Sequence, residues 1–286
     1  MRSGPLTVAA VQMESGEDLS RNVRSALALV HHAADQGATY VQLPEYFNFL
    51  GPGRQFSSVA ESVPGPTTER LGAAARGRAI TVHLGSMLET SLEPGKCYNT
   101  SVVLGESGNI VAVYRKAHLF DVAVPDAVFQ RESDAVVAGE QLVVARMGPL
   151  RLGLSVCFDL RFGELYRTLA LSGANVFAVP AAFNAVTGEA HWATLVRARA
   201  IENHAYVVAA AQVGVTAAGI ATFGHSMIVG PWGEVLGESA ARGEDVVVAS
   251  IDLDEVARRR QQIAVLDLRR PALYDVTKVM TRTSDE

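Results

Sequence analysis

The feature that most constrains the fold is a short unit that occurs twice, in which a helix-like stretch stops and a buried strand follows. Residues 37–44 read GATYVQLP and residues 173–180 read GANVFAVP. Glycine commonly ends a helix, and a strand-like and a helix-like stretch precede each unit. The pattern predicts two related β-α-β halves, and therefore two sheets packed together with helices outside. The alternative is that this motif is simply a common way to end a helix and begin a buried strand.

The hydrophobic pattern predicts one α/β domain over residues 1–286, without a linker that would divide it. Helices are expected over residues 14–34, 66–76, 162–171, 187–204 and 253–260, with Thr187 as a possible N-cap. Strands are expected over residues 6–13, 39–43, 79–85, 98–104, 110–114, 139–147, 150–156, 176–179, 206–212, 223–229 and 245–252. The tail, about residues 261–286, lacks periodicity but is too apolar for a free linker, so we expect it to pack at a subunit interface.

Composition excludes several classes of function. The chain is 49% apolar and 19% charged with a net charge of −5, which disfavours nucleic acid or an anionic membrane as a partner. No stretch approaches the ~20 apolar residues that cross a bilayer, and the N-terminal apolar run resembles a first strand more than a signal peptide. Without an export signal, we expect a cytoplasmic protein whose Cys97 and Cys157 are reduced. No metal-ligand spacing is present, so neither a metal nor another cofactor is expected.

Three apolar strand-like runs end on chemically active side chains. Glu45 ends the run that starts at Tyr40, Lys116 ends the run from Ile110, and Cys157 ends the run from Leu152. Open α/β sheets bind ligands at the carboxyl ends of their strands. The pattern therefore predicts an acid, an amine and a thiol around one crevice.

These three groups suit nucleophilic attack on an amide or nitrile carbon. Cys157 lies where a strand passes to a helix, and unpaired N–H groups there are expected to lower its pKa. Glu45 is the candidate to accept and return the proton, while Lys116 and the N–H of Phe158 are the candidates to hold the oxyanion. Taken singly, each residue has a plainer reading, such as an inert buried thiol for Cys157 and a solvated surface charge for Glu45 or Lys116.

Three motifs resemble the signature regions of the nitrilase superfamily of carbon–nitrogen hydrolases. They are LPEYF at 43–47, YRKAHLFD at 114–121 and LSVCFDLRF at 154–162, and the similarity extends from Val8 to about Tyr274. The resemblance implies a four-layer α-β-β-α sandwich of two packed mixed sheets with outer helices. It also implies a Glu-Lys-Cys triad at Glu45, Lys116 and Cys157, and no cofactor. An assisting second glutamate is matched to Glu132, with Glu140 as the alternative.

Other stretches, at 182–192, 197–202, 224–227 and 231–234, are similar to the branch that contains omega-amidase and deaminated glutathione amidase. This likeness implies a thiol-dependent amidase that hydrolyses a non-peptide C–N bond of a small carboxylate-bearing amide through a cysteine thioester, releasing ammonia. It also implies a homodimer or larger homo-oligomer. The alternatives are an N-carbamoyl amide hydrolase of the same superfamily and a scaffold protein without turnover.

Four residues of this region are predicted to contact the substrate: Arg161, Phe183, Asn184 and Thr187. Arg161 is matched to a carboxylate clamp, because a guanidinium binds a carboxylate through two parallel hydrogen bonds. The alternative for Arg161 is an ion pair with Glu164 or with another neighbouring acid.

Overall fold

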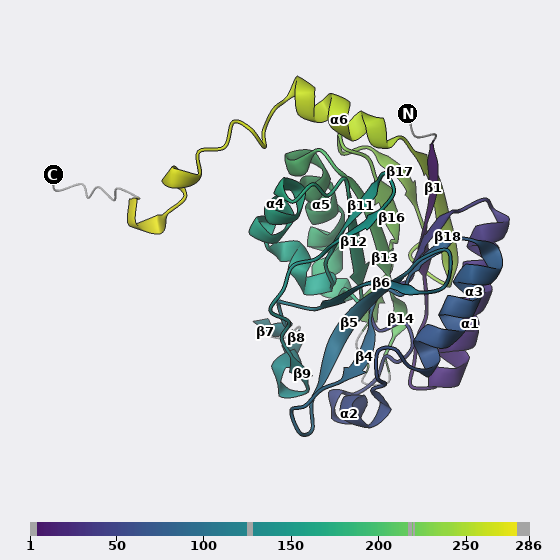
Figure 1. Cartoon of the computed structure of the whole chain (residues 1–286). Coiled ribbons are helices and arrows are strands. Elements are labelled where there is room, and N and C mark those ends of the chain that lie inside the picture. Colours follow the sequence, from purple (N-terminus) through teal and green to yellow (C-terminus); the bar gives the residue numbers. More distant parts are fainter. Residues whose placement is uncertain (1–4, 125–127, 217–218, 220, 279–286) are drawn as a thin grey trace, which may run out of the picture.

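Two sheets packed face to face, each covered by helices on its outer side, make up the structure (Figure 1). This computed structural model describes residues 5–124, 128–216, 219 and 221–278. Helices α1 (Leu19–Asp35) and α3 (Pro66–Arg78) cover one sheet, and α4 (Gly163–Leu171) and α5 (Ala185–Asn203) cover the other. The predicted four-layer α-β-β-α sandwich is confirmed.

Both sheets mix parallel and antiparallel strands. Within the described residues, the first sheet has the order β18 (Asp245–Ile251), β1 (Leu6–Gln12), β2 (Tyr40–Gln42), β3 (Thr81–His83), β5 (Cys97–Leu104) and β4 (Met87–Thr90), with β6 (Ile110–Arg115) and β9 (Val136–Val137) also paired to β5. The second sheet has the order β10 (Val144–Met147), β11 (Leu150–Leu154), β12 (Val176–Ala181), β13 (Tyr206–Ala211), β16 (Met227–Val229) and β17 (Val235–Glu238). Two small hairpins stand apart, β7 (Asp121–Val124) with β8 (Val128–Arg131) and β14 (Val213–Val215) with β15 (Ala221–Phe223).

Strand β1 shows how the layers are held together. Its side chains alternate between the two faces of the sheet, as the two-residue period of a strand requires. Val8 and Ala10 join the core between the sheets, whereas Ala9 and Val11 join the core beneath α1 and α3. Because both faces are buried, the strand is one continuous apolar run.

The two halves repeat one topology, as the paired sequence units predict. In the first half β1, β2 and β3 are parallel and are connected through α1 and α3; in the second half β11, β12 and β13 are parallel and are connected through α4 and α5. Gly37 and Gly173 follow α1 and α4 with φ of +87° and +93°. This left-handed conformation strains other residues, which explains why glycine ends both helices.

Two helix starts differ from the sequence prediction because polar side chains decide them. Helix α1 begins at Leu19 rather than at residue 14, since the side chain of Asp18 caps it by accepting from Arg21 N. Helix α5 begins at Ala185, and its N-cap is Asn184 rather than Thr187. An Asn or Asp side chain satisfies an N–H group of the first turn that would otherwise lack a partner.

Several strands also differ from the prediction. The single strand expected at 223–229 is two strands, β15 and β16, because Gly224 and His225 both adopt positive φ between them. The strand expected at 139–147 begins only at Val144. The short strands β4 and β9 and the β7–β8 hairpin were not predicted, since runs of two to four residues carry too little periodicity.

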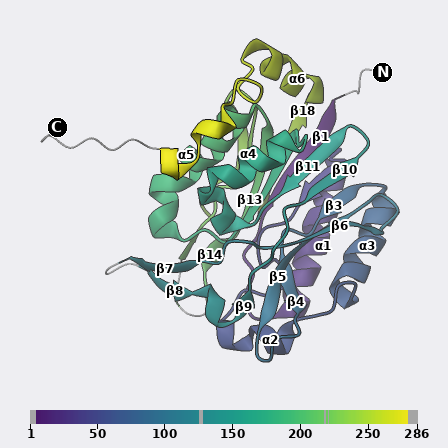
Figure 2. The ribbon, with the colours of Figure 1, turned by 60° about the vertical axis from the view of Figure 1, so that its left-hand side comes forward.

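The C-terminal segment leaves the sandwich after α6 (Leu253–Gln262) and contains the short helices η4 (Pro271–Leu273) and η5 (Val276–Lys278), as Figures 1 and 2 show. Leu266 still packs partly against the core, but Leu268 is 76% exposed and Val276 is 83% exposed. Among the described residues, no helix is both long and apolar enough to cross a membrane.

Candidate active site

One cavity of about 250 Å³ lies at the carboxyl ends of the strands and receives side chains from both sheets. Glu45 and Lys116 reach it just beyond β2 and β6 of the first sheet, and Cys157 reaches it just beyond β11 of the second. The structure thus brings together the three residues that the sequence predicted to meet.

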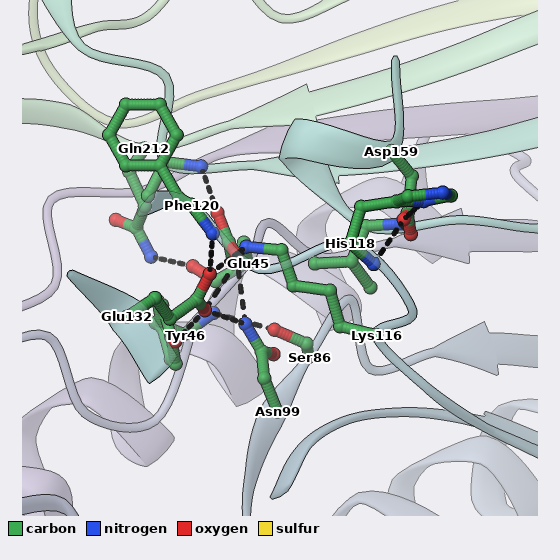
Figure 3. Close-up of polar contacts among 12 residues, drawn as sticks. Glu45, Tyr46, Ser86, Asn99, Lys116, His118, Phe120, Glu132, Asp159 and Gln212 are labelled. Carbon is green, nitrogen blue, oxygen red and sulfur yellow. Dashed lines mark hydrogen bonds and ion pairs between the residues drawn. The ribbon is translucent and has the colours of Figure 1, made fainter. Parts of the chain in front are cut away.

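Lys116 is the centre of a buried ionic cluster (Figure 3). Its Nζ lies 2.9 Å from Oε1 of Glu45 and 2.8 Å from Oε2 of Glu132, and the lysine side chain is only 2% exposed. Burial alone lowers the pKa of Lys116, but the two carboxylates outweigh it and hold this pKa well above its usual value. The ammonium therefore stays charged inside the protein.

Glu132 rather than Glu140 completes this cluster. Its Oε1 accepts a hydrogen bond from Tyr46 Oη at 2.6 Å, and its Oε2 accepts one from Phe120 N at 2.7 Å. Burial raises the pKa of Glu132, but Lys116 and these donors together hold it below the usual value. Glu140 is exposed and does not line the cavity.

Asn99 bridges the two carboxylates. Its Nδ2 donates to Oε1 of Glu45 at 2.9 Å and to Oε1 of Glu132 at 3.2 Å (Figure 3). Sequence reasoning missed Asn99 and Tyr46. Tyr46 could have been found because it directly follows a predicted catalytic acid, whereas Asn99 carried no clear signal, since it is one of several polar side chains in the first half of β5.

The second sheet fixes Glu45 from the opposite side. Ala182 N, just after β12, donates to Oε2 of Glu45 at 2.8 Å. Gln212, just after β13, donates from Nε2 to the carbonyl oxygen of Glu45 at 2.9 Å. The orientation of this carboxylate therefore depends on both sheets.

Cys157 differs from expectation in its electrostatics. A short 3₁₀ helix, η3 (Cys157–Arg161), follows β11, and Cys157 itself has a φ of +46°. Burial and then the negative charge of Glu45 raise its pKa well above the ordinary value, while Lys116 acts in the opposite direction with less effect. The predicted lowering of this pKa is wrong, because desolvation and a neighbouring carboxylate outweigh the dipole of one short turn. The thiol is protonated and lies beside a base.

The remaining predicted site residues line the same cavity: Phe158, Arg161, Phe183, Asn184 and Thr187. The guanidinium of Arg161 lies 5.1 Å from the centroid of the Phe183 ring and bonds to Nδ1 of His191 at 3.2 Å. No ion pair joins it to Glu164 or to another acid in the described ranges. Arg161 therefore has no carboxylate partner in the described protein, which leaves its charge available to the cavity.

The described part of the chain contains no group of three His, Cys, Asp or Glu side chains placed to hold a metal ion. The chemistry that this arrangement supports is attack by a thiol beside a carboxylate and an ammonium.

Comparisons with known proteins agree with this chemistry. The carbon–nitrogen hydrolase family matches residues 7–261. Human omega-amidase NIT2 is 39% identical over 269 residues, which cover 94% of this chain and 96% of that protein. Deaminated glutathione amidase from Synechocystis is 40% identical over 268 residues, which cover 93% of this chain and 98% of that protein.

A solved structure adds a chemical parallel. An amidase from Nesterenkonia sp. AN1 superposes with a TM-score of 0.79 at 27% identity, covering 94% of this chain and 95% of that chain. That crystal structure shows the acetamide moiety of fluoroacetamide covalently added at the active-site cysteine. The chain described here belongs to the carbon–nitrogen hydrolase family, within the nitrilase superfamily, and is an enzyme that acts on amide C–N bonds.

Proposed function

We propose that this enzyme is an amidase of the omega-amidase or deaminated glutathione amidase type, with Cys157 as its nucleophile. The observation that carries the proposal is that three groups line one cavity: the protonated thiol of Cys157, the Glu45 carboxylate and the Lys116 ammonium. A protonated thiol needs a base at the moment of attack, and Glu45 is the carboxylate next to it.

In the proposed reaction, the Cys157 sulfur attacks the amide carbon while its proton passes to Glu45. The oxyanion that forms accepts hydrogen bonds from the Lys116 ammonium and from the Phe158 N–H, which directly follows the nucleophile. Glu45 returns the proton to the nitrogen of the leaving group, the C–N bond breaks and a thioester remains. Glu45 then takes a proton from water while the oxygen attacks the thioester, the C–S bond breaks to release the carboxylic acid, and Glu45 returns the proton to the Cys157 sulfur.

Glu132 is proposed to assist through Lys116. Each of its oxygens lies within 3.1 Å of Nζ, while Tyr46 and Phe120 N hold the carboxylate from its other sides. Glu132 thereby keeps the ammonium charged and directed at the cavity after Glu45 has been protonated.

Arg161 supports a substrate that carries a carboxylate. Its cation lines the cavity without an acidic partner among the described residues, between the rings of Phe158 and Phe183. A desolvated guanidinium recognises a carboxylate by charge and by geometry. The substrate is therefore proposed to be the amide of a small dicarboxylic acid. One carboxyl group of that acid forms the amide, and the other is free and lies at Arg161.

A second arginine favours the deaminated glutathione type of substrate. Arg131, at the end of β8, lines the cavity together with the 50–53 segment and is paired only loosely with Asp134, at 3.6 Å. Deaminated glutathione carries a carboxylate on each side of its γ-amide, so one of them is proposed to lie at Arg161 and the other at Arg131. α-Ketoglutaramate would use Arg161 alone.

The test is release of 2-oxoglutarate from α-ketoglutaramate and from deaminated glutathione, since hydrolysis of either γ-amide yields this acid. N-Carbamoyl-β-alanine, assayed for ammonia, tests the carbamoyl alternative. Cys157→Ala is expected to abolish turnover, and Cys97→Ala is the matched control because its buried thiol does not line the cavity. Turnover that persists without Cys157 would refute the mechanism. Absence of turnover by the wild-type enzyme on all three compounds would refute the substrate assignment.

The exposed apolar tail supports an oligomer. Leu268, Leu273, Tyr274 and Val276 are all at least half exposed, and burying such side chains is favourable. We propose that they pack on a second copy of the chain. A chain truncated after Gln262 is expected to lose its larger oligomers in sedimentation experiments, and an unchanged mass distribution would refute this assignment.

A further inference from the structure

Asp159 is a buried carboxylate that lies outside the cavity yet contacts both halves of the site. Its side chain accepts four hydrogen bonds, and Figure 3 shows it beside His118. Oδ2 accepts from Tyr114 Oη at 2.7 Å and from Val156 N at 2.8 Å. Oδ1 accepts from His118 N at 3.0 Å and pairs with His118 Nδ1 at 2.7 Å. A fully buried charge requires donors of this number and quality.

These donors belong to two turns that carry catalytic residues. Tyr114 and His118 flank Lys116 in what we name the lysine turn (residues 114–118), which leaves β6 of the first sheet. Val156 precedes Cys157 in what we name the cysteine turn (residues 156–159), which leaves β11 of the second sheet. One carboxylate therefore joins the ammonium-bearing turn to the thiol-bearing turn.

The cysteine turn needs this support because its backbone is strained. Cys157 has a φ of +46°, a conformation that costs conformational energy in any residue with a Cβ. Asp159 closes the turn twice, since its N–H donates to Val156 O at 3.0 Å while its carboxylate accepts from Val156 N. Without the carboxylate, Val156 N would lose its partner and one of the bonds that oppose relaxation of Cys157 would be absent.

The lysine turn is held just as directly. Tyr114 Oη, which donates to Asp159, also accepts from Ala117 N at 3.1 Å. The His118 ring stacks on Phe162, directly after η3, with the centroids 3.6 Å apart. We propose that Asp159 is a positioning residue that holds Cys157 in register with Lys116 across the two sheets.

The proposal predicts a specific defect in Asp159→Asn, which preserves size but removes the charge and one acceptor. We expect kcat to fall by about 10²-fold with KM within about threefold, because a small misplacement of reacting groups slows the chemical step. The pH profile of Cys157 alkylation by iodoacetamide is a second readout. Its midpoint is expected to move toward the ordinary thiol value of about 8.5, because relaxation of the turn exposes the sulfur to water and separates it from Glu45, the two causes that raise its pKa.

Glu89→Gln is the matched control. Glu89 is also a buried carboxylate with several donors, Thr100 and Arg115, but all of them lie in the first sheet. We expect Glu89→Gln to lower the melting temperature without moving kcat or the alkylation profile. Equal losses of kcat in both variants at equal stability, or wild-type values of kcat and of the alkylation midpoint in Asp159→Asn, would overturn the proposal.

Milder variants decide the question if Asp159→Asn does not fold. Tyr114→Phe and His118→Leu each remove one side-chain donor, and each is expected to lower kcat by about tenfold; normal kcat in both would overturn the proposal. The kcat readout rests on the proposed function, whereas the alkylation profile does not. A wild-type enzyme that turns over no amide would therefore refute the function and leave the alkylation comparison to decide the role of Asp159.

Discussion

Replacing Lys116 by Met tests the charge balance of the buried cluster. The substitution keeps an unbranched side chain as far as Cε but leaves Glu45 and Glu132 facing each other without the cation that lies 2.9 and 2.8 Å from them. Removing one partner of a buried ion pair typically costs about 3–5 kcal/mol, a large part of the ~5–15 kcal/mol by which a domain is stable. We expect a loss of this size at pH 8.

The loss should depend on pH with a definite sign. Two buried carboxyls without a cation share one proton, so the pair titrates above the ~4.3 of the unfolded chain. A carboxyl whose pKa is higher in the folded than in the unfolded protein contributes stability that is lost as the pH increases. Between the two pKa values, the free energy of unfolding falls by about 1.4 kcal/mol per pH unit. In the wild type, the pKa of Glu132 is lowered instead, so its contribution disappears only on acidification. The deficit of Lys116→Met is therefore smaller at pH 5 than at pH 8.

Urea unfolding at pH 5, 6.5 and 8 measures this deficit. Lys96→Met is the control, because Lys96 forms a surface ion pair with Glu93 and should cost less than about 1 kcal/mol at each pH. A deficit for Lys116→Met that is equal at all three pH values, or no larger than that of the control, would refute the reasoning.

Three further comparisons separate the roles of neighbouring residues. Glu132→Gln should lower kcat by about 10²-fold, because Glu132 supports the proposed oxyanion donor Lys116. Glu140→Gln should leave steady-state rates unchanged, and equal effects of the two variants would reject Glu132 as the assisting glutamate. Arg161→Met should lower kcat/KM about 10- to 100-fold for α-ketoglutaramate but little for uncharged butyramide, and a uniform loss on both amides would contradict the carboxylate clamp. Asn184→Ala should destabilise the protein by about 1 kcal/mol in thermal unfolding and Thr187→Ala by less, because Asn184 caps α5; the reverse order would contradict that assignment.

The sequence predicted the layers and the main site residues because both depend on patterns along the chain. Buried strands appear as apolar runs, and Glu45, Lys116 and Cys157 each end one of them. Asn99 was not predicted, since its importance comes from the register of β5 relative to two distant carboxylates. Likewise, the pKa of Cys157 was misjudged from its place in the chain, because burial and Glu45 act through space.

The division of the site between two sheets makes catalytic activity a measure of complete folding. Glu45 and Lys116 follow strands of one sheet and Cys157 follows a strand of the other, so a folding intermediate with only one sheet formed cannot bring the three side chains together. The segment between β9 and β10 separates Glu45 and Lys116, which precede it in the chain, from Cys157, which follows it. Two fragments divided there would each be inert, and recovery of turnover on mixing would report that the sheets have docked and that β18 has paired with β1.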